Sequence, residues 1–198
     1  MIRSLVLVAL LSTSLTTYAQ TWIVDKAHSK VGFTTTYLLL SDVDGNFKTF
    51  DAKITAAKPD LSDAVFELTA DVNSIDTDIE RRDTDLKGDK YFDAAKFPTV
   101  TFKSTSFKKV ADKKYALVGE LTMHGVSKPI TMDVVMNGPI ETQGRTGKEM
   151  KAGFSATGTL KRTDFGIGAS GGAMISEEIE LKVNGIFTKQ NPAANSSK

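Results

Sequence analysis

The sequence predicts an all-β protein made of about eight antiparallel strands, and three observations support this. Apolar and polar residues alternate along most of the chain, as they do in strands with one buried and one exposed face. The connections between the alternating runs are mostly short, which is typical of antiparallel neighbours. One segment alone, residues 77–96, breaks the alternation. Such a set of strands buries its apolar faces as a sandwich or closes into a barrel.

The alternation is clearest in the middle of the chain. Phe66 and Leu68 are separated by Glu67, and Phe154 and Ala156 are separated by Ser155. In each case the apolar residues share one face of the predicted strand, because side chains alternate with a period of two. The predicted strands lie within residues 28–40, 46–56, 64–72, 99–107, 115–123, 130–136, 150–160 and 175–187.

Two connections are expected to differ in length. The stretch HGVSKP, residues 124–129, predicts a tight turn closed by Pro129 and therefore an antiparallel hairpin. The stretch NGPIETQGRTG, residues 137–147, predicts a longer polar loop.

The exceptional segment at about 77–96 predicts a short helical insertion. Thr77 is followed three residues later by Glu80, which is a capping box, and Gly88 is a helix stop. Asp89 is placed to cap a second short helix over residues 90–97, which Pro98 would end. In a barrel, such an insertion between strands is expected to lie across one end.

The first 19 residues predict a secretory signal peptide. Arg3 is followed by an unbroken apolar run from Leu5 to Leu11 and by the small-x-small site at 17–19. The run is far shorter than the ~20 residues of a membrane span, and no later segment reaches that length. We therefore expect an exported, soluble, periplasmic or secreted protein with a single domain over 20–190 and a disordered polar tail over 191–198.

The composition disfavours several kinds of partner and site. The chain has no cysteine, so a disulfide framework, a thiolate metal site and a lipid-anchored cysteine are all excluded. Without Arg3, 24 basic side chains balance 24 acidic ones, and no basic stripe is present for nucleic acid. No nucleic-acid partner and no membrane span are expected.

The residues that carry enzyme chemistry are sparse. The two histidines, His28 and His124, lie on separate elements without a metal-binding spacing, and a structural role is the favoured interpretation. The glycine-rich stretch 166–172 lacks the lysine of a phosphate loop and predicts a turn. We expect no catalytic residue, no metal and no cofactor.

The residues alone leave open whether the interior of a barrel would be filled or hollow. Small residues such as Ala70, Ala156 and Gly158 on the inward faces favour a hollow barrel around one ligand. Large residues such as Met123 and Met132 favour a filled one. The pattern supports the two interpretations about equally.

Six motifs in a fixed order then point to a known family. They are Asp25, His28, Ser29, Val31 and Phe33; Val43, Gly45 and Phe47; residues 74–77 with Arg82, Asp83 and Leu86; YFDAAKFPTVTFKS at 91–104; GELTMHGVSKPITM at 119–132; and KRTDFGIG at 161–168. With these motifs, nearly all of the chain after the signal peptide resembles the YceI-like family of exported bacterial polyisoprenoid-binding proteins. The resemblance departs at Tyr37 and Asp85, where the family often has histidines.

The resemblance implies a lipocalin-like eight-stranded antiparallel β-barrel with a hollow interior and a helical segment by its mouth. It also implies a long-chain isoprenoid or fatty lipid as ligand, with neither catalysis nor metal. The residues expected to line the tunnel and bind the ligand are large apolar or aromatic side chains, namely Phe33, Tyr37, Phe66, Phe92, Phe97, Phe102, Met123, Met132, Phe154 and Phe165.

Two other functions stay open at this point. One is an enzyme, a hydrolase or isomerase, that acts on a barrel-bound lipid with His28 or His124 as base. The other is a filled barrel that serves as an interaction module. A homodimer also stays open as a partner.

Overall fold

The computed structural model describes residues 19–144, 147–171 and 174–190. The signal peptide expected over 1–19, apart from its last residue, and the tail expected over 191–198 lie outside the described residues. The elements, in chain order, are β1 (Gln20–Val24), η1 (Lys26–His28), β2 (Lys30–Tyr37), β3 (Ser41–Phe47), β4 (Phe50–Ala56), β5 (Val65–Asp71), η2 (Val72–Ser74), β6 (Ile75–Asp76), α1 (Glu80–Lys87), β7 (Thr99–Ala111), β8 (Lys114–Met123), β9 (Val126–Gln143), β10 (Lys148–Lys161), η3 (Arg162–Phe165) and β11 (Ile175–Lys189).

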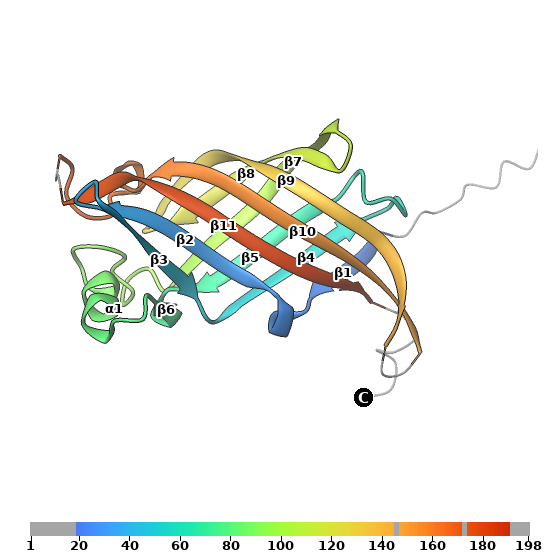
Figure 1. The fold of residues 1–198 in the computed structure, drawn as a ribbon, viewed down its shortest axis with the longest axis horizontal. Helices are drawn as coiled ribbons and strands as arrows, with labels where there is room; N and C mark the ends of the chain where they lie inside the picture. Colours follow the sequence, from blue (N-terminus) through green and yellow to red (C-terminus); the bar gives the residue numbers. More distant parts are fainter. Residues whose placement is uncertain (1–18, 145–146, 172–173, 191–198) are drawn as a thin grey trace, which may run out of the picture.

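Eight of these strands close into an antiparallel barrel, which confirms the predicted fold class (Figure 1). The ring runs β1-β4-β5-β7-β8-β9-β10-β11 and returns to β1, so every strand in it has a partner on both sides. Closure removes the exposed edges that an open sheet would leave.

The remaining strands extend the wall at one end of the barrel. The long strand β11 pairs with β1 through Val24 and Phe187, and with β2 further along through Val183 and Val31. The 3-10 turn η1 separates β1 from β2. Strand β2 pairs with β3, and β3 pairs with β6. We call this the mouth end, defined by the β2–β3 turn, α1 and the η3–β11 connection, and the opposite end the far end (Figure 1).

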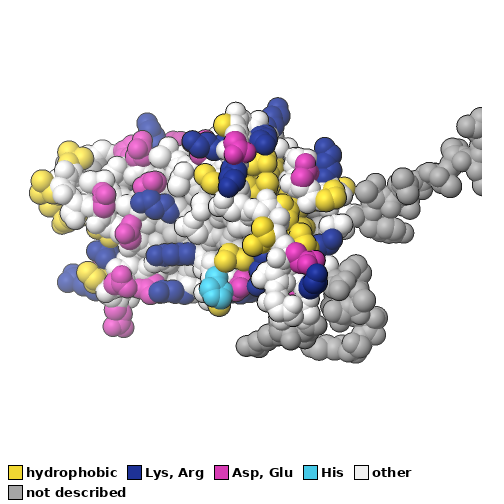
Figure 2. All heavy atoms as spheres, turned by 45° about the vertical axis from the view of Figure 1, so that its right-hand side comes forward, with side chains coloured by type: hydrophobic (Ala, Val, Ile, Leu, Met, Phe, Trp, Pro, Cys, Tyr) yellow, Lys and Arg dark blue, Asp and Glu magenta, His cyan; other side chains and the backbone are white. Residues whose placement is uncertain are grey.

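The outer surface is polar and the interior is apolar, as the alternation predicts. On β4, Ala52 and Ile54 are buried, while Asp51 and Lys53 are exposed. Figure 2 shows charged side chains over the outer face, with hydrophobic side chains in a band right of centre and at the left-hand end, where the β2–β3 turn lies in Figure 1. Leu39 in that turn is 81% exposed.

One predicted loop is largely strand. The chain expected to form a loop over 137–147 continues β9 to Gln143, and β10 begins at Lys148. A bulge between Lys151 and Gly153 accommodates the Gly138-Pro139 segment, so proline interrupts the ladder without ending the strand. The hairpin expected at 124–129 is confirmed, with a shorter turn than predicted. His124 and Gly125 both have positive φ, as the central residues of a type I′ turn do, and β9 resumes at once.

The helical insertion is shorter than predicted. Only Glu80–Lys87 is helical, and residues 88–98 form turns. The expected second helix is wrong because Asp93 has a φ of 48° and its N–H bonds back to the carbonyl of Gly88. The expected capping box is wrong as well, since Ile79 is the N-cap and Thr77 bonds instead to Asp83. Within the described part of the chain, no helix is long and apolar enough to cross a membrane.

Candidate functional site

The barrel interior contains a cavity of about 520 Å³, which makes the barrel hollow. Its wall is formed almost entirely by apolar side chains of the ring strands and of β2 and β3. Cavities of about 300–1,000 Å³ with apolar walls and a few polar groups are typical of small-molecule sites. The size and lining are therefore those of a binding site for an apolar ligand.

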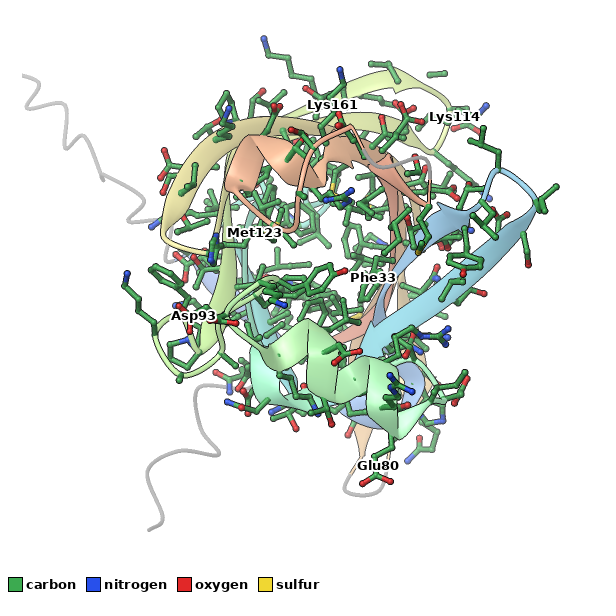
Figure 3. All side chains as sticks on the ribbon, turned by 90° about the vertical axis from the view of Figure 1, so that its left-hand side faces the viewer. Phe33, Glu80, Asp93, Lys114, Met123 and Lys161 are labelled. Atoms are coloured by element: carbon green, nitrogen blue, oxygen red, sulfur yellow. The ribbon has the colours of Figure 1, made fainter. Side chains whose placement is uncertain are left out.

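Eight of the ten residues predicted to line the tunnel do line this cavity. They are Phe33, Tyr37, Phe66, Phe92, Phe102, Met123, Met132 and Phe154. Seen along the barrel from the mouth end, the side chains of Phe33 and Met123 stand on opposite walls of the interior (Figure 3). Contact of these residues with a ligand stays a prediction.

Phe97 and Phe165 lie elsewhere. The ring of Phe97 packs against His124, with 4.8 Å between ring centroids, beside the β8–β9 turn. Phe165 is buried in η3, and its carbonyl accepts a hydrogen bond from Nδ1 of His124 at 3.0 Å. Both phenylalanines hold the connections of the mouth end together outside the cavity.

Aromatic rings form the floor of the cavity towards the far end. The ring centroid of Phe154 is 5.2 Å from that of Phe66 and 5.7 Å from that of Phe187, in edge-to-face arrangements. Beneath them Phe107 stacks on Tyr115 at 4.4 Å. Edge-to-face rings at these distances attract one another beyond their buried area.

Two aromatic rings in the wall lie on glycines of neighbouring strands. A Cβ added to Gly45 would fall within the ring of Phe33, and a Cβ added to Gly119 would meet the ring of Phe102. The absence of a side chain on each glycine therefore lets the adjacent ring lie flat against the sheet and leaves room in the interior.

The mouth is covered in part by α1, which a polar network holds in place. Asp83 accepts hydrogen bonds from both the N–H and the hydroxyl of Thr77, at 2.8 and 2.5 Å. Arg82 donates to the hydroxyl and the carbonyl of the same threonine, at 2.8 and 2.6 Å. Leu86 on this helix lines the cavity.

The segment after α1 contributes aromatic side chains to the mouth. Tyr91 and Phe92 both line the cavity, and Phe92 packs edge-on against Phe47 at 6.2 Å. Sequence reasoning did not select Tyr91 or Phe47 as lining residues. The alternation along β3 was a usable signal for Phe47, which has the same parity as Gly45.

Arg162 is a lining residue that sequence reasoning missed. Its side chain is only 7% exposed, at the point where β10 ends and η3 begins. The guanidinium donates to four backbone carbonyls, those of Ile167, Ala169, Ile175 and Ser176, at 2.7–3.2 Å. Arg162 thus ties the η3–β11 connection to the barrel rim.

Neither histidine lies in the cavity wall. Nδ1 of His28 is 2.9 Å from Oδ2 of Asp25, and this hydrogen bond is the main reason that the pKa of Asp25 lies below its usual value. His124 is engaged with Phe165, as described above. In the described segments no group of three or more His, Asp or Glu side chains is placed to hold a metal ion.

Ion pairs join charged side chains of adjacent strands on the outer face of the sheet. Glu67 lies between Lys53 and Lys103 on adjacent strands, with N–O distances of 2.7 and 3.0 Å. Hydrogen bonds from these two lysines hold the pKa of Glu67 below its usual value. Such exposed pairs contribute little to stability.

Comparison with known proteins decides the family. The family model described as YceI-like domain matches residues 22–187, which span nearly the whole barrel. The chain belongs to the YceI-like family. Among curated members, Protein YceI of Salmonella newport is 36% identical over 180 residues, covering 90% of this chain and 92% of the relative.

Solved structures of similar proteins share the YceI-like barrel. A Campylobacter jejuni YCEI protein superposes with a TM-score of 0.66 at 32% identity, covering 84% of this chain and 96% of that one. BcnA of Burkholderia cenocepacia has a TM-score of 0.72 at 24% identity, covering 82% and 98%. A polyisoprenoid binding domain from Saccharophagus degradans has a TM-score of 0.61 at 15% identity, covering 85% and 98%. The last two comparisons show the fold alone.

Proposed function

We propose that this YceI-like protein binds a long-chain isoprenoid or fatty lipid inside its barrel and carries, stores or scavenges it. One observation carries the proposal: the barrel surrounds a cavity of about 520 Å³ with an apolar wall and an aromatic floor. A packed core would fill such a space, because protein interiors have few voids larger than a water molecule. An interior kept open by glycines under Phe33 and Phe102 is suited to an apolar guest.

One structural neighbour supports this class of ligand. The Saccharophagus degradans domain, which shares the fold, is described as polyisoprenoid binding. An isoprenoid chain is apolar, flexible and narrow, and these properties suit it to an apolar cavity inside a closed barrel.

The energetics of burial are sufficient for useful affinity. At ~30 Å³ for each water-sized group, the cavity holds on the order of 17 methylene-sized groups. Burial of each contributes ~0.8 kcal/mol, or ~14 kcal/mol gross. Micromolar binding requires ~8 kcal/mol net, and association costs upwards of ~4 kcal/mol. Apolar burial alone is therefore enough for micromolar affinity when the association cost is towards the low end of its range.

We propose that the protein acts outside the cytoplasm, because the sequence predicts a signal peptide. An exported carrier in the periplasm or the medium would shield an apolar chain from water between membranes. We propose this location together with the lipid-binding function.

The direct test introduces a charge into the cavity wall. Phe102→Asp places a carboxylate in an apolar interior, which is strongly unfavourable next to a bound hydrocarbon chain. We expect it to abolish uptake of a fluorescent long-chain lipid, as measured by titration. The control is Thr105→Asp, an exposed position on the same strand, which should bind as the wild type does. A folded Phe102→Asp variant that binds normally would contradict the proposal.

A further inference from the structure

Arg162 brings a positive charge into the rim of the cavity without a negative partner. All four of its hydrogen bonds go to backbone carbonyls, and no carboxylate of the described segments forms an ion pair with it. A guanidinium has five N–H groups. Nε donates one, Nη1 donates two and Nη2 donates one, so one N–H of Nη2 is left over. A buried charge is costly unless it is paired.

Thr35 supplies a second polar group that lacks a partner. It lies on β2 between the lining residues Phe33 and Tyr37, and it lines the cavity as they do. Its hydroxyl oxygen is buried and has no hydrogen-bond partner within the described chain. Its neighbours Thr34 and Thr36, on the opposite face of the strand, bond to Asp44 and Asp42.

The two groups lie beside the same short stretch of β11. Arg162 donates to the carbonyls of Ile175 and Ser176 at the start of that strand. Thr35 pairs with Ile179 of the same strand, and the register between β2 and β11 shifts between Ile175 and Ile179. They therefore face the mouth-end part of the cavity from the two sides of β11.

We propose that Arg162 and Thr35 form a head-group subsite that selects amphiphiles with a hydrogen-bond-accepting oxygen. The inference rests on the proposed lipid-binding function and names its ligand more closely: a chain that ends in a carbonyl, carboxylate or phosphate oxygen. The tail extends to the aromatic floor and the oxygen lies at the mouth end, where it accepts from the free N–H of Arg162 and from the hydroxyl of Thr35.

The other charged groups at the mouth leave this role to Arg162. Arg82 also lines the cavity and has three N–H groups that are not engaged with Thr77, but it is only half-buried, so water can accept from them. Arg162 is buried, and its remaining N–H has no such access to water. Asp85 lines the mouth from α1 and is exposed, so water screens its carboxylate. A carboxylate repels anions and accepts nothing from a carbonyl, and it cannot supply the donors that an oxygen head requires.

The test compares three probes with the same chain and different heads: dodecane, methyl decyl ketone and dodecanoate. Each is titrated against the folded wild-type protein by displacement of a bound fluorescent lipid. Hydrogen bonds to a charged donor are the strong ones. We expect at least one of the two oxygen-bearing probes to bind roughly ten-fold or more tightly than dodecane. Tighter binding of the ketone would indicate a subsite for a neutral acceptor, and tighter binding of dodecanoate would indicate one for an anionic acceptor.

Thr35→Val is the decisive variant, because it removes the hydroxyl and keeps the shape. We expect it to weaken the preferred oxygen-bearing probe about five-fold and to leave dodecane unchanged, since a neutral hydrogen bond is weaker than a charged one. The matched control is Thr36→Val, on the outer face of the same strand, which should change neither. Arg162→Gln should abolish the preference for that oxygen-bearing probe over dodecane, and thermal unfolding shows whether the variant is folded.

The outcomes separate the two proposals. Wild-type protein that binds all three probes equally, or Thr35→Val protein that keeps the full preference, would overturn the head-group subsite and leave lipid binding intact. Failure of all three probes and of the fluorescent lipid to bind would overturn the proposed function itself.

Discussion

The two ends of the barrel are built from similar aromatic side chains but use them differently. At the far end, Phe107 and Tyr115 stack beneath Phe66, Phe154 and Phe187, and these rings fill the space between the strands. Phe66, Phe154 and Phe187 also form the floor of the cavity, which the stacked pair beneath them closes off. At the mouth end, Phe92 and Phe33 line the cavity with no such stacked pair beyond them. There the wall is completed by a short helix and by turns.

The difference separates a closely packed end from the end that contains the proposed binding site. Close-packed rings at the far end contribute the buried contacts that resist unfolding. The mouth end has few packed layers and depends on polar contacts such as those of Thr77 and Arg162. Binding elements are generally drawn from the less stable parts of a structure. We therefore expect substitutions at the two ends to separate stability from ligand affinity.

Phe107→Ala should have the largest effect on stability. Phe107 is 9% exposed, lies below the cavity floor and does not line the cavity. Removal of a buried phenylalanine costs about 3–5 kcal/mol of unfolding free energy. Urea denaturation measures the loss, and lipid titration of the remaining folded protein should give nearly the wild-type affinity. A loss well below 1 kcal/mol would mean that the far end is not the stable part.

Gly45→Ala should affect the mouth end at moderate cost. The added methyl group meets the ring of Phe33 and must push it towards the cavity. Overpacking of this kind costs about 1–3 kcal/mol, and we expect lipid affinity to fall as the cavity narrows. The control is Gly153→Ala, where an added Cβ would be 4.0 Å from its nearest neighbour. Neither the stability nor the lipid affinity of this variant should fall. Equal behaviour of the two variants would contradict the proposed role of Gly45.

Asp83→Ala should loosen the mouth without unfolding the barrel. It leaves the N–H and hydroxyl of Thr77 without their acceptor, which costs about 1–3 kcal/mol locally. Hydrogen exchange should speed up at the amides of α1 and stay unchanged in β8 and β9. Uniformly faster exchange throughout the barrel would show that α1 is part of the cooperative core.

The smallest effect is expected at Asp25, at the bend between β1 and β2. Its pKa is lowered, chiefly by the hydrogen bond from His28, so its stabilising contribution is fully present above the unfolded value of 3.8. The contribution is lost as the pH falls through the lower folded-state pKa. Asp25→Asn should therefore be slightly less stable than the wild type near neutral pH, and this difference should shrink in strong acid. The midpoints of urea denaturation of the wild type and the variant, taken near neutral pH and in strong acid, measure this difference.

The strands of the barrel were predictable because each has one buried and one exposed face. Alternation through Phe66, Leu68 and Phe154 located them. Eight of the ten residues predicted to line the cavity do so, because large apolar or aromatic residues on the inward faces were selected. The five-residue strand β1 was missed because Trp22 and Val24 form too short a run to stand out.

Tertiary contacts decided the features that could not be predicted. Thr77 resembles a helix cap in the sequence, yet its hydroxyl bonds to Asp83 and Arg82, which lie on the helix itself. Phe97 is as apolar as Phe92, and only the position of His124 explains why it packs outside the cavity. The burial of Arg162 depends on the carbonyls of a connection that has no local signature.

The central claim, that the cavity holds a lipid, is tested most directly by extracting the purified, folded protein with organic solvent and identifying the extract by mass spectrometry. We predict a long-chain isoprenoid or fatty lipid in roughly one-to-one ratio with the protein, carrying an oxygen at one end. An extract without lipid, obtained again after the folded protein has been incubated with such lipids, would contradict the account.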